Sequence, residues 1–260
     1  MNLSIKAETS MGKSTLAMTA PKKVVVLNSD MGADGALNGF MFDSLFKRFK
    51  CQTIDYRGAT EDSWKDFDIT IVEFPAPLTL RSEVLVGKKE MWDSFLRLFV
   101  DACEDKEVRT IVLDTATIWR RHRADAHLQA LQEKNKADGE KPRQQLQQIE
   151  YGRPNDDIRA LYTYTQSIKK NLVAIHHLTD EYINDKATGN RIMEGLNNTY
   201  NFMDWAVQMD KKKGAIVAKI TKCRNNSNME GTEIPSPTWN KLVDMVSMSL
   251  GGRVQFEKEV

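Results

Sequence analysis

The sequence predicts an α/β fold built on a mostly parallel central sheet flanked by helices. Continuous apolar runs within 24–30, 67–74 and 108–117 are typical of strands buried on both faces. Helix-forming segments separate these runs, and such alternation favours crossover connections between parallel strands. A loop with the spacing of a phosphate-binding motif follows the first strand, so we expect the ligand at the carboxyl edge of the sheet.

Length and composition limit the possible number of domains, the classes of partner and the location of the protein. The 260 residues fit one large α/β domain with insertions. With 37 basic and 36 acidic residues, no global field directs the chain to nucleic acid or membrane, and any nucleic-acid contact must be local. Three dispersed cysteines argue against a zinc site and a disulfide framework, which favours a cytoplasmic location. Neither a signal peptide nor a membrane-spanning run is expected.

The stretch KAETSMGKST, residues 6–15, has the spacing of a phosphate-binding loop between a strand and a helix. Backbone N–H groups at such a helix N-terminus bind phosphates. We expect Lys13 to reach the β and γ phosphates of ATP and Ser14 to hold Mg²⁺. The residues expected around the nucleotide are Glu8, Thr9, Ser10, Met11, Gly12, Lys13, Ser14 and Thr15.

A plainer interpretation of this loop is a helix cap. Ser10 or Thr9 would then be the N-cap residue, and Lys13 a surface lysine in the first turn. Ala7 stands where the motif usually has its first glycine, and alanine does not freely adopt positive φ. We therefore expect a cost in phosphate binding from Ala7.

Three carboxylates end predicted strands and compete for roles beside the phosphates. Asp114 closes the run VRTIVLD, the pattern of a Walker B strand, and is the candidate for the magnesium shell opposite Ser14. Asp30 follows the second strand and is the candidate for orienting the attacking water, with Glu73 as its rival. Asp30 could equally be the N-cap of a helix expected at about 35–49, so the sequence leaves its role open.

The segment 119–154 is a polar helical insertion. Arg120, Arg121 and Arg123 form a basic cluster, and Tyr151 is available for stacking. We favour a nucleic-acid-facing role over the alternative, a solvated helical hairpin. The five-residue spacing of the histidines within this segment does not place two metal ligands on one helix face.

The last third of the core adds further candidates. The strand at 171–178 ends in His176 and His177, and one of them could contact the γ phosphate while the other is a core histidine. Residues 180–195, which include Arg191, predict a hairpin or flexible loop, and 198–209 a helix. A late strand at 214–224 precedes a C-terminal extension, 227–260, with one helix capped by Ser236 and Pro237.

These motifs together resemble the RecA-like P-loop ATPases, in particular the compact phage-type RecA-family proteins linked to single-strand annealing and recombination. The resemblance covers about residues 3–226, the expected ATPase core. VLNSDMGAD at 26–34 is similar to the strand that ends in the catalytic carboxylate, and VLDTAT at 112–117 to the Walker B strand. AIHHLT at 174–179 falls where the family senses the γ phosphate, which gives that role to His177.

The resemblance also implies partners. KITKCR at 219–224 is similar to the family strand whose basic residues reach the ATP of the neighbouring subunit, so Lys222 and Arg224 become candidate trans residues. The loop at about 180–195, with Arg191, becomes a DNA-binding loop. A homo-oligomer on single-stranded DNA follows, with ATP at its interfaces and no membrane. Other recombination or replication proteins are further partners that the resemblance suggests.

The loop departs from the family at Ala7 and Met11, so slow turnover is expected. Two alternative functions to the DNA-binding ATPase stay open. A P-loop kinase would phosphorylate a nucleotide or small molecule and use the arginine cluster as a lid. A non-hydrolysing scaffold would only be gated by ATP.

Overall fold

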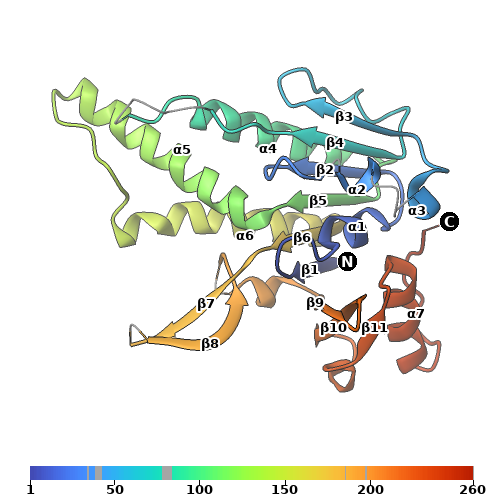
Figure 1. Ribbon diagram of the computed structural model, residues 1–260. Helices are drawn as coiled ribbons and strands as arrows, with labels where there is room; N and C mark the ends of the chain where they lie inside the picture. The colour runs from blue at the N-terminus through green and yellow to red at the C-terminus, as the bar shows by residue number, and fades with distance from the viewer. Residues whose placement is uncertain (34, 39–42, 78–83, 185, 197, 260) are drawn as a thin grey trace.

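A mostly parallel sheet with helices on both faces forms the body of the protein (Figure 1). The computed structural model describes residues 1–33, 35–38, 43–77, 84–184, 186–196 and 198–259. Within these ranges the strand order is β11-β10-β9-β1-β6-β5-β2-β4-β3, and β7 and β8 form a separate two-stranded sheet. The predicted α/β class is therefore confirmed.

The strands and helices of the described residues have the following bounds. The strands are β1 Asn2–Lys6, β2 Val24–Asn28, β3 Cys51–Asp55, β4 Ile69–Glu73, β5 Thr110–Asp114, β6 Asn171–His176, β7 Leu178–Ile183, β8 Lys186–Met193, β9 Trp205–Lys212, β10 Ala215–Cys223 and β11 Glu233–Pro235. The helices are α1 Lys13–Met18, α2 Gly35–Asn38, α3 Asp43–Phe46, α4 Lys88–Glu104, α5 Ala116–Ala137, α6 Gly152–Ser167 and α7 Trp239–Ser249, with 3-10 turns η2 Gln148–Tyr151, η3 Thr199–Phe202 and η4 Ser227–Met229.

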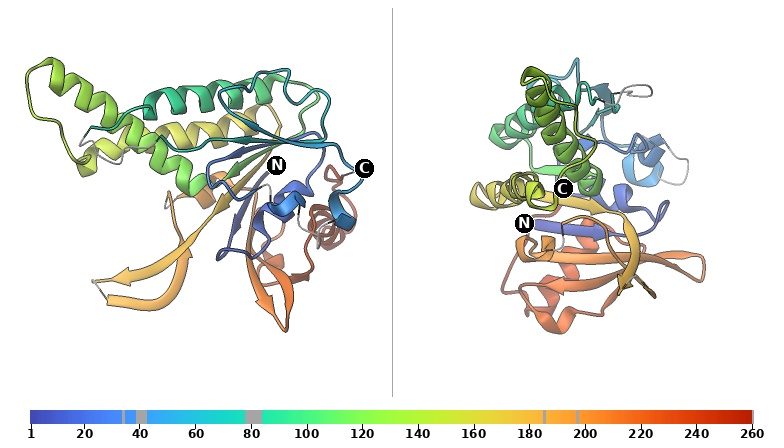
Figure 2. Two further views of the ribbon diagram at one scale, coloured as in Figure 1. Left: turned by 45° about the horizontal axis from the view of Figure 1, so that its top comes forward. Right: turned by 90° about the vertical axis from the view of Figure 1, so that its left-hand side faces the viewer.

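Two apolar clusters lie on opposite faces of the sheet. Helices α4, α5 and α6 cover one face, and α1 and α7 the other (Figures 1 and 2). Strands β2 and β5 are buried along their whole length, as their continuous apolar runs predict. The two layers bury both faces of the sheet, so the strand ends at its carboxyl edge are the places where the strands can present polar side chains to a ligand.

The predicted polar insertion forms the long arm of the molecule. Helix α5 begins right after β5 and extends well beyond the sheet, with α6 returning beside it (Figure 2). The arm is not simply solvated, because Gln129 and Gln132 are buried and accept backbone N–H groups at Lys88 (2.7 Å) and Leu85 (2.8 Å). Polar residues in this segment therefore hold the chain before α4 in place.

The expected helix at 198–209 is wrong. Only η3 is helical, and the chain continues as strand β9, which pairs in parallel with β1. The outer edge of β1 would otherwise leave its backbone groups unpaired, and this requirement outweighs local helix propensity. Residues 180–195 form the predicted hairpin, β7 and β8, which projects from the body (Figure 1).

Two other expected helices differ from the structure at their ends. The expected helix at 35–49 appears as α2 and α3, with 39–42 outside the described residues. The C-terminal helix starts later than expected, because the Thr238 side chain, not that of Ser236, accepts the capping hydrogen bond from Lys241. The division at residue 226 stays a prediction, although β11 joins the main sheet beyond it. None of the described helices is both long and apolar enough to cross a membrane.

Candidate functional site

Four neighbouring strands end at the same edge of the sheet and build the candidate site. In the order β1-β6-β5-β2, the register places Lys6 beside His176 and Asp114 beside Asn28. The loop at 7–12 follows β1, and Asp30 follows β2 by two residues. Because carboxyl ends of parallel strands converge at one edge, residues far apart in sequence meet there.

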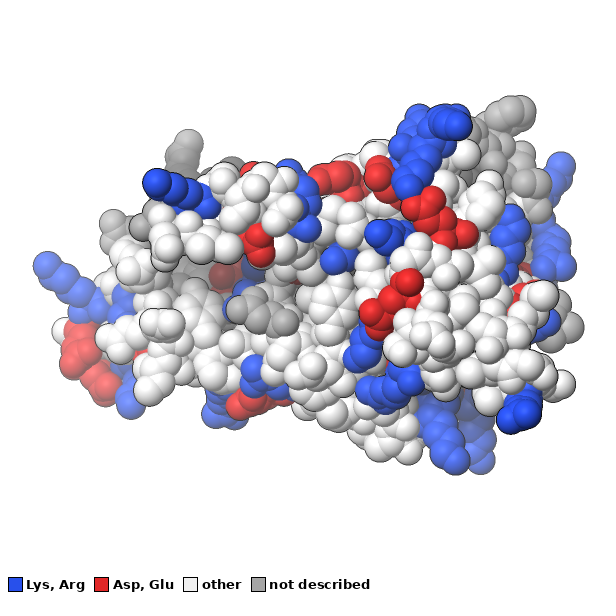
Figure 3. All heavy atoms as spheres, turned by 90° about the horizontal axis from the view of Figure 1, so that it is seen from below, with Lys and Arg blue, Asp and Glu red and all other residues white. Residues whose placement is uncertain are grey.

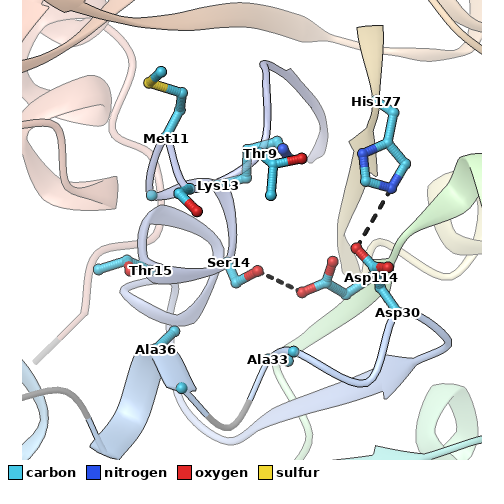
Figure 4. Close-up of a pocket in the computed structure, with 14 residues that line it drawn as sticks. Thr9, Met11, Lys13, Ser14, Thr15, Asp30, Ala33, Ala36, Asp114 and His177 are labelled. Atoms are coloured by element: carbon cyan, nitrogen blue, oxygen red, sulfur yellow. Dashed lines mark hydrogen bonds and ion pairs between the residues drawn. The ribbon is translucent and has the colours of Figure 1, made fainter.

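A cavity of about 400 Å³ opens between these strand ends, within the range of small-molecule sites. The loop and first helical turn, 9–15, form one wall, and Asp30, Asp114 and His177 lie across from it (Figure 4). The predicted nucleotide-loop residues and three predicted chemical groups are therefore brought together. Only Glu8 of the loop set does not line the cavity.

The backbone of the loop explains the tolerance of alanine at its first position. Positive φ occurs at Ser10 (62°) and Gly12 (73°), whereas Ala7 has none. The expected conformational cost at Ala7 is therefore wrong for this loop. Gly12 is the position that needs glycine's freedom, because it precedes α1 in the left-handed conformation.

Lys13 is buried and turned back onto its own loop. Its Nζ donates to the carbonyl oxygens of Ala7 at 3.0 Å and Glu8 at 2.7 Å. Burial lowers the pKa of the Lys13 ammonium, and the nearby negative charge of Asp114 raises it in part. An anion in the cavity would further stabilise this charge.

Ser14 and Asp114 meet across the sheet. The Ser14 hydroxyl donates to Asp114 Oδ2 at 2.6 Å (Figure 4). Burial raises the pKa of the Asp114 carboxyl to about 6, and the charge of Asp30 adds to this effect. A carboxylate so placed is stabilised by a cation. A hydroxyl and a carboxylate oxygen are ligands that Mg²⁺ accepts, and Lys13 suits phosphate, so the residues fit ATP with Mg²⁺.

Of the two candidates for orienting water, Asp30 and Glu73, Asp30 lines the cavity. Its Oδ2 lies 3.4 Å from His177 Nε2, and both side chains line the cavity (Figure 4). Glu73 ends β4, one strand beyond β2, and is not among the described residues lining the cavity. The geometry therefore favours Asp30 over Glu73 for a role on water, a choice that stays a prediction.

The two histidines have different surroundings. His176 is buried, and burial lowers its pKa to about 3, in keeping with a core residue. His177 lines the cavity, and its backbone N–H donates to the Thr117 hydroxyl at 3.2 Å. Thr117 in turn donates to the Glu194 carbonyl at 2.8 Å. Thr117 was not predicted from the sequence. Its position three residues after Asp114, in the first turn of α5, is the signal that could have identified it.

Lys222 and Arg224 lie at the opposite end of the sheet. Lys222 pairs in register with Ala206, close to the start of β9. It donates to the Tyr200 carbonyl, and Arg224 forms an ion pair with Asp204 at 2.7 Å. Neither residue lines the cavity of its own chain. The structure therefore does not bring these two predicted residues to the cavity of their own chain, and their role in trans stays a prediction.

The arginine cluster is engaged within the arm. Arg120 donates to Asn155 at 2.9 Å, and its guanidinium lies 6.0 Å from the Tyr151 ring centroid. Arg123 pairs with Asp157 at 2.6 Å, and its side chain is only 11% exposed. Arg121 binds Glu194 but keeps 61% of its side chain exposed. Arg121 is the cluster member best placed to meet an external phosphate.

Comparison with known proteins identifies the family of the chain. A family model described as an AAA domain matches residues 2–242. Among solved structures, the chain is similar to a KaiC-like protein of the hyperthermophilic archaeon Pyrococcus horikoshii OT3, with 13% identity, a TM-score of 0.45 and coverage of 90% of this chain and 83% of that one. It is also similar to the RadB recombinase, with 12% identity, a TM-score of 0.46 and coverage of 90% and 85%. The sequence matches no curated protein. The family match confirms the P-loop ATPase resemblance of the sequence.

Proposed function

The chain belongs to the AAA domain family, and from this premise we propose that it is an oligomeric, Mg²⁺-dependent ATPase that acts on single-stranded DNA. Recombination, repair or replication of the phage type is the proposed setting. The observation that carries the proposal is the cavity in which Lys13 and the Ser14–Asp114 pair face Asp30 and His177. These are the groups needed for phosphate binding, metal binding and water positioning.

Each group has one proposed task. Lys13 binds the β and γ phosphates, which requires it to exchange the carbonyls of its own loop for phosphate oxygens. Ser14 and Asp114 hold Mg²⁺. Asp30 orients the attacking water, and His177 contacts the γ phosphate. Magnesium supplies charge neutralisation on the phosphates, and the protein supplies orientation and water exclusion.

The hairpin β7–β8 is the proposed DNA-binding element. It starts one residue after His177, so it continues directly from the cavity wall. Tyr182 and Ile183, near its tip, are 63% and 57% exposed, and an exposed tyrosine is a stacking platform for a base. On the face seen from below, Lys and Arg side chains lie in several separate groups (Figure 3). Among the described residues, no single continuous basic surface is seen on this face, so any contact with DNA through the hairpin would be local.

Assembly is proposed because Lys222 and Arg224 lie away from their own cavity. Basic groups contributed by a neighbour would stabilise the charge that develops on the transferred phosphate. Turnover would then depend on protein concentration as well as on DNA.

The test is ATP turnover measured with and without single-stranded DNA over a series of protein concentrations. We expect DNA-stimulated, concentration-dependent hydrolysis, and a loss of at least about a hundredfold in Lys13→Ala. Lys23→Ala is the matched control, because Lys23 forms an ion pair with Glu107 away from the cavity. Turnover that requires a small-molecule acceptor would instead identify a kinase, and ATP binding without turnover a scaffold.

A further inference from the structure

An ion pair joins the hairpin to the phosphate-binding loop. Arg191, on β8, lies with its guanidinium 2.8 Å from the carboxylate of Glu8. Glu8 belongs to the loop but does not line the cavity, so its side chain is free for this contact. The contact connects two elements that the proposed function assigns to different ligands.

Arg191 is shared between the loop and its own hairpin. Its guanidinium also lies 3.2 Å from Asp180 and donates to the Leu178 carbonyl at 3.2 Å. Asp180 is the register partner of Arg191, so these contacts hold the guanidinium near the base of the hairpin. The Arg191 side chain remains 42% exposed, and the Glu8 side chain 48%. A phosphate arriving at the hairpin can therefore reach the guanidinium, and phosphate matches its donors as well as carboxylate does.

Glu8 is also one of the two residues that hold Lys13. The Glu8 carbonyl accepts the Lys13 ammonium at 2.7 Å, while the Glu8 side chain binds Arg191. The ion pair thus engages the side chain of a residue whose backbone carbonyl holds the Lys13 ammonium at the cavity wall. A phosphate in the cavity would compete with these carbonyls for the Lys13 ammonium.

Resting on the proposed function, we propose that Arg191 is a positioning residue that couples the hairpin to the phosphate-binding loop through Glu8. While Arg191 binds Glu8, the loop keeps Lys13 on the carbonyls of Ala7 and Glu8. A phosphate of single-stranded DNA at the hairpin competes for the guanidinium, releases Glu8, and makes Lys13 available to the nucleotide. Linkage requires the reverse effect too, so bound nucleotide strengthens DNA binding by the same factor.

The decisive variant is Glu8→Gln, which removes the acceptor charge and leaves Arg191 on the hairpin. Its affinity for a fluorescent, non-hydrolysable ATP analogue with Mg²⁺ is measured with and without a poly-dT oligonucleotide. Without DNA we expect binding about two- to fivefold tighter than in the wild type, the range for a half-exposed ion pair. The oligonucleotide should then add little. Glu133→Gln is the matched control, because Glu133 forms a half-exposed ion pair with Lys89 at 2.7 Å elsewhere.

Variants of Arg191 separate coupling from simple folding effects. Arg191→Ala should also tighten analogue binding without DNA, and its effect should disappear in a Glu8→Gln background. Arg191→Lys keeps the charge and should restore part of the DNA dependence. If Glu8→Gln keeps the wild-type affinity and DNA enhancement, the coupling is wrong while the ATPase proposal stands. If the wild type binds no analogue, or shows no DNA effect, the proposed function and the coupling both fall.

Discussion

The two ends of the central sheet differ in what surrounds their buried charged groups. At the carboxyl end, Asp114 and Lys13 are buried with pKa values shifted toward their neutral forms. At the amino end, burial also lowers the pKa of Lys22, to about 8, but the tail at 253–259 supplies Glu259 as its ion-pair partner at 3.8 Å. The same strands supply both ends, so the difference lies in the loops and not in the scaffold. Buried charges that line an open cavity, as Lys13 and Asp114 do, mark the end where a charged ligand is expected.

The tail at the amino end is held by several independent contacts. Phe256 packs edge-on against Trp205, with ring centroids 4.7 Å apart. Glu257 accepts from the Asn171 amide at 2.9 Å, and Glu259 pairs with Arg48 at 2.6 Å. These contacts lie at or before the starts of β9, β6 and β3. The amino end is therefore closed by the chain itself, whereas the carboxyl end contains the open cavity.

Substitution of Arg224 has the largest expected effect. Arg224 lies at the amino end of its own sheet, and in an oligomer it would reach the nucleotide at the carboxyl end of the neighbouring subunit's sheet. Arg224→Ala should lower ATP turnover by about a thousandfold, the contribution of a charge supplied in trans. Mixing Arg224→Ala with Lys13→Ala should restore part of the turnover, since some interfaces then combine an intact loop with an intact Arg224. Lys219→Ala is the control, because Lys219 lies on β10, the strand that Arg224 follows, and is exposed. A mixture as inactive as its components would contradict the trans role.

Substitutions of Asp30 and Glu73 test which of the two carboxylates orients the attacking water. Asp30→Asn should reduce turnover about a hundredfold with little change in analogue affinity, because the residue acts on water and not on binding. Glu73→Gln should stay near the wild-type rate, since Glu73 is not among the described residues lining the cavity. Single-turnover rates measure both. A larger loss in Glu73→Gln would reverse the assignment.

Asp114 should show opposite effects on function and on stability. Asp114→Asn should weaken Mg²⁺-dependent nucleotide binding by about ten- to a hundredfold. Without metal, it should raise the free energy of unfolding at pH 7 by an amount on the order of 2 kcal/mol, because a buried charge is removed.

The pH dependence of that stability has a defined sign. The folded Asp114 pKa of about 6 lies above the ordinary 3.8, so wild-type stability falls as pH rises from about 4 to 6. The gain in Asp114→Asn should therefore shrink as pH is lowered through this window. Denaturant titrations in a chelating buffer measure it, with exposed Asp66→Asn as control. A gain independent of pH would contradict the role of the buried charge.

Most residues that meet at the carboxyl end of the sheet could be predicted from the sequence, because each belongs to a short motif at the end of a strand. Ser14 and Asp114 each follow or end a recognisable strand, and convergence of parallel strand ends brings them together without further information. The choice of Asp30 over Glu73 needed the strand order, because both carboxylates end buried strands. Sequence spacing alone does not show which strand lies nearer the cavity.

Contacts between distant segments could not be predicted from the sequence. The pair of Arg191 with Glu8 depends on how the hairpin leaves β6, and β9 was predicted as a helix because its pairing with β1 is a tertiary effect. A conformational cost was expected at Ala7 because this residue stands where the phosphate-binding motif usually has its first glycine. In the structure, positive φ falls on Ser10 and Gly12 instead.

The closed amino end gives the smallest expected effect, confined to stability. Phe256 is partly buried against Trp205, so Phe256→Ala should lower the free energy of unfolding by about 1–3 kcal/mol, less than a fully buried phenylalanine. Analogue affinity, measured at dilute protein, should not change, because the tail and the cavity lie at opposite ends of the sheet. Val254→Ala is the matched control, since Val254 is 39% exposed in the same tail. A loss of nucleotide affinity in Phe256→Ala alone would show that the two ends are energetically coupled through the strands, and the scaffold could no longer be treated as rigid.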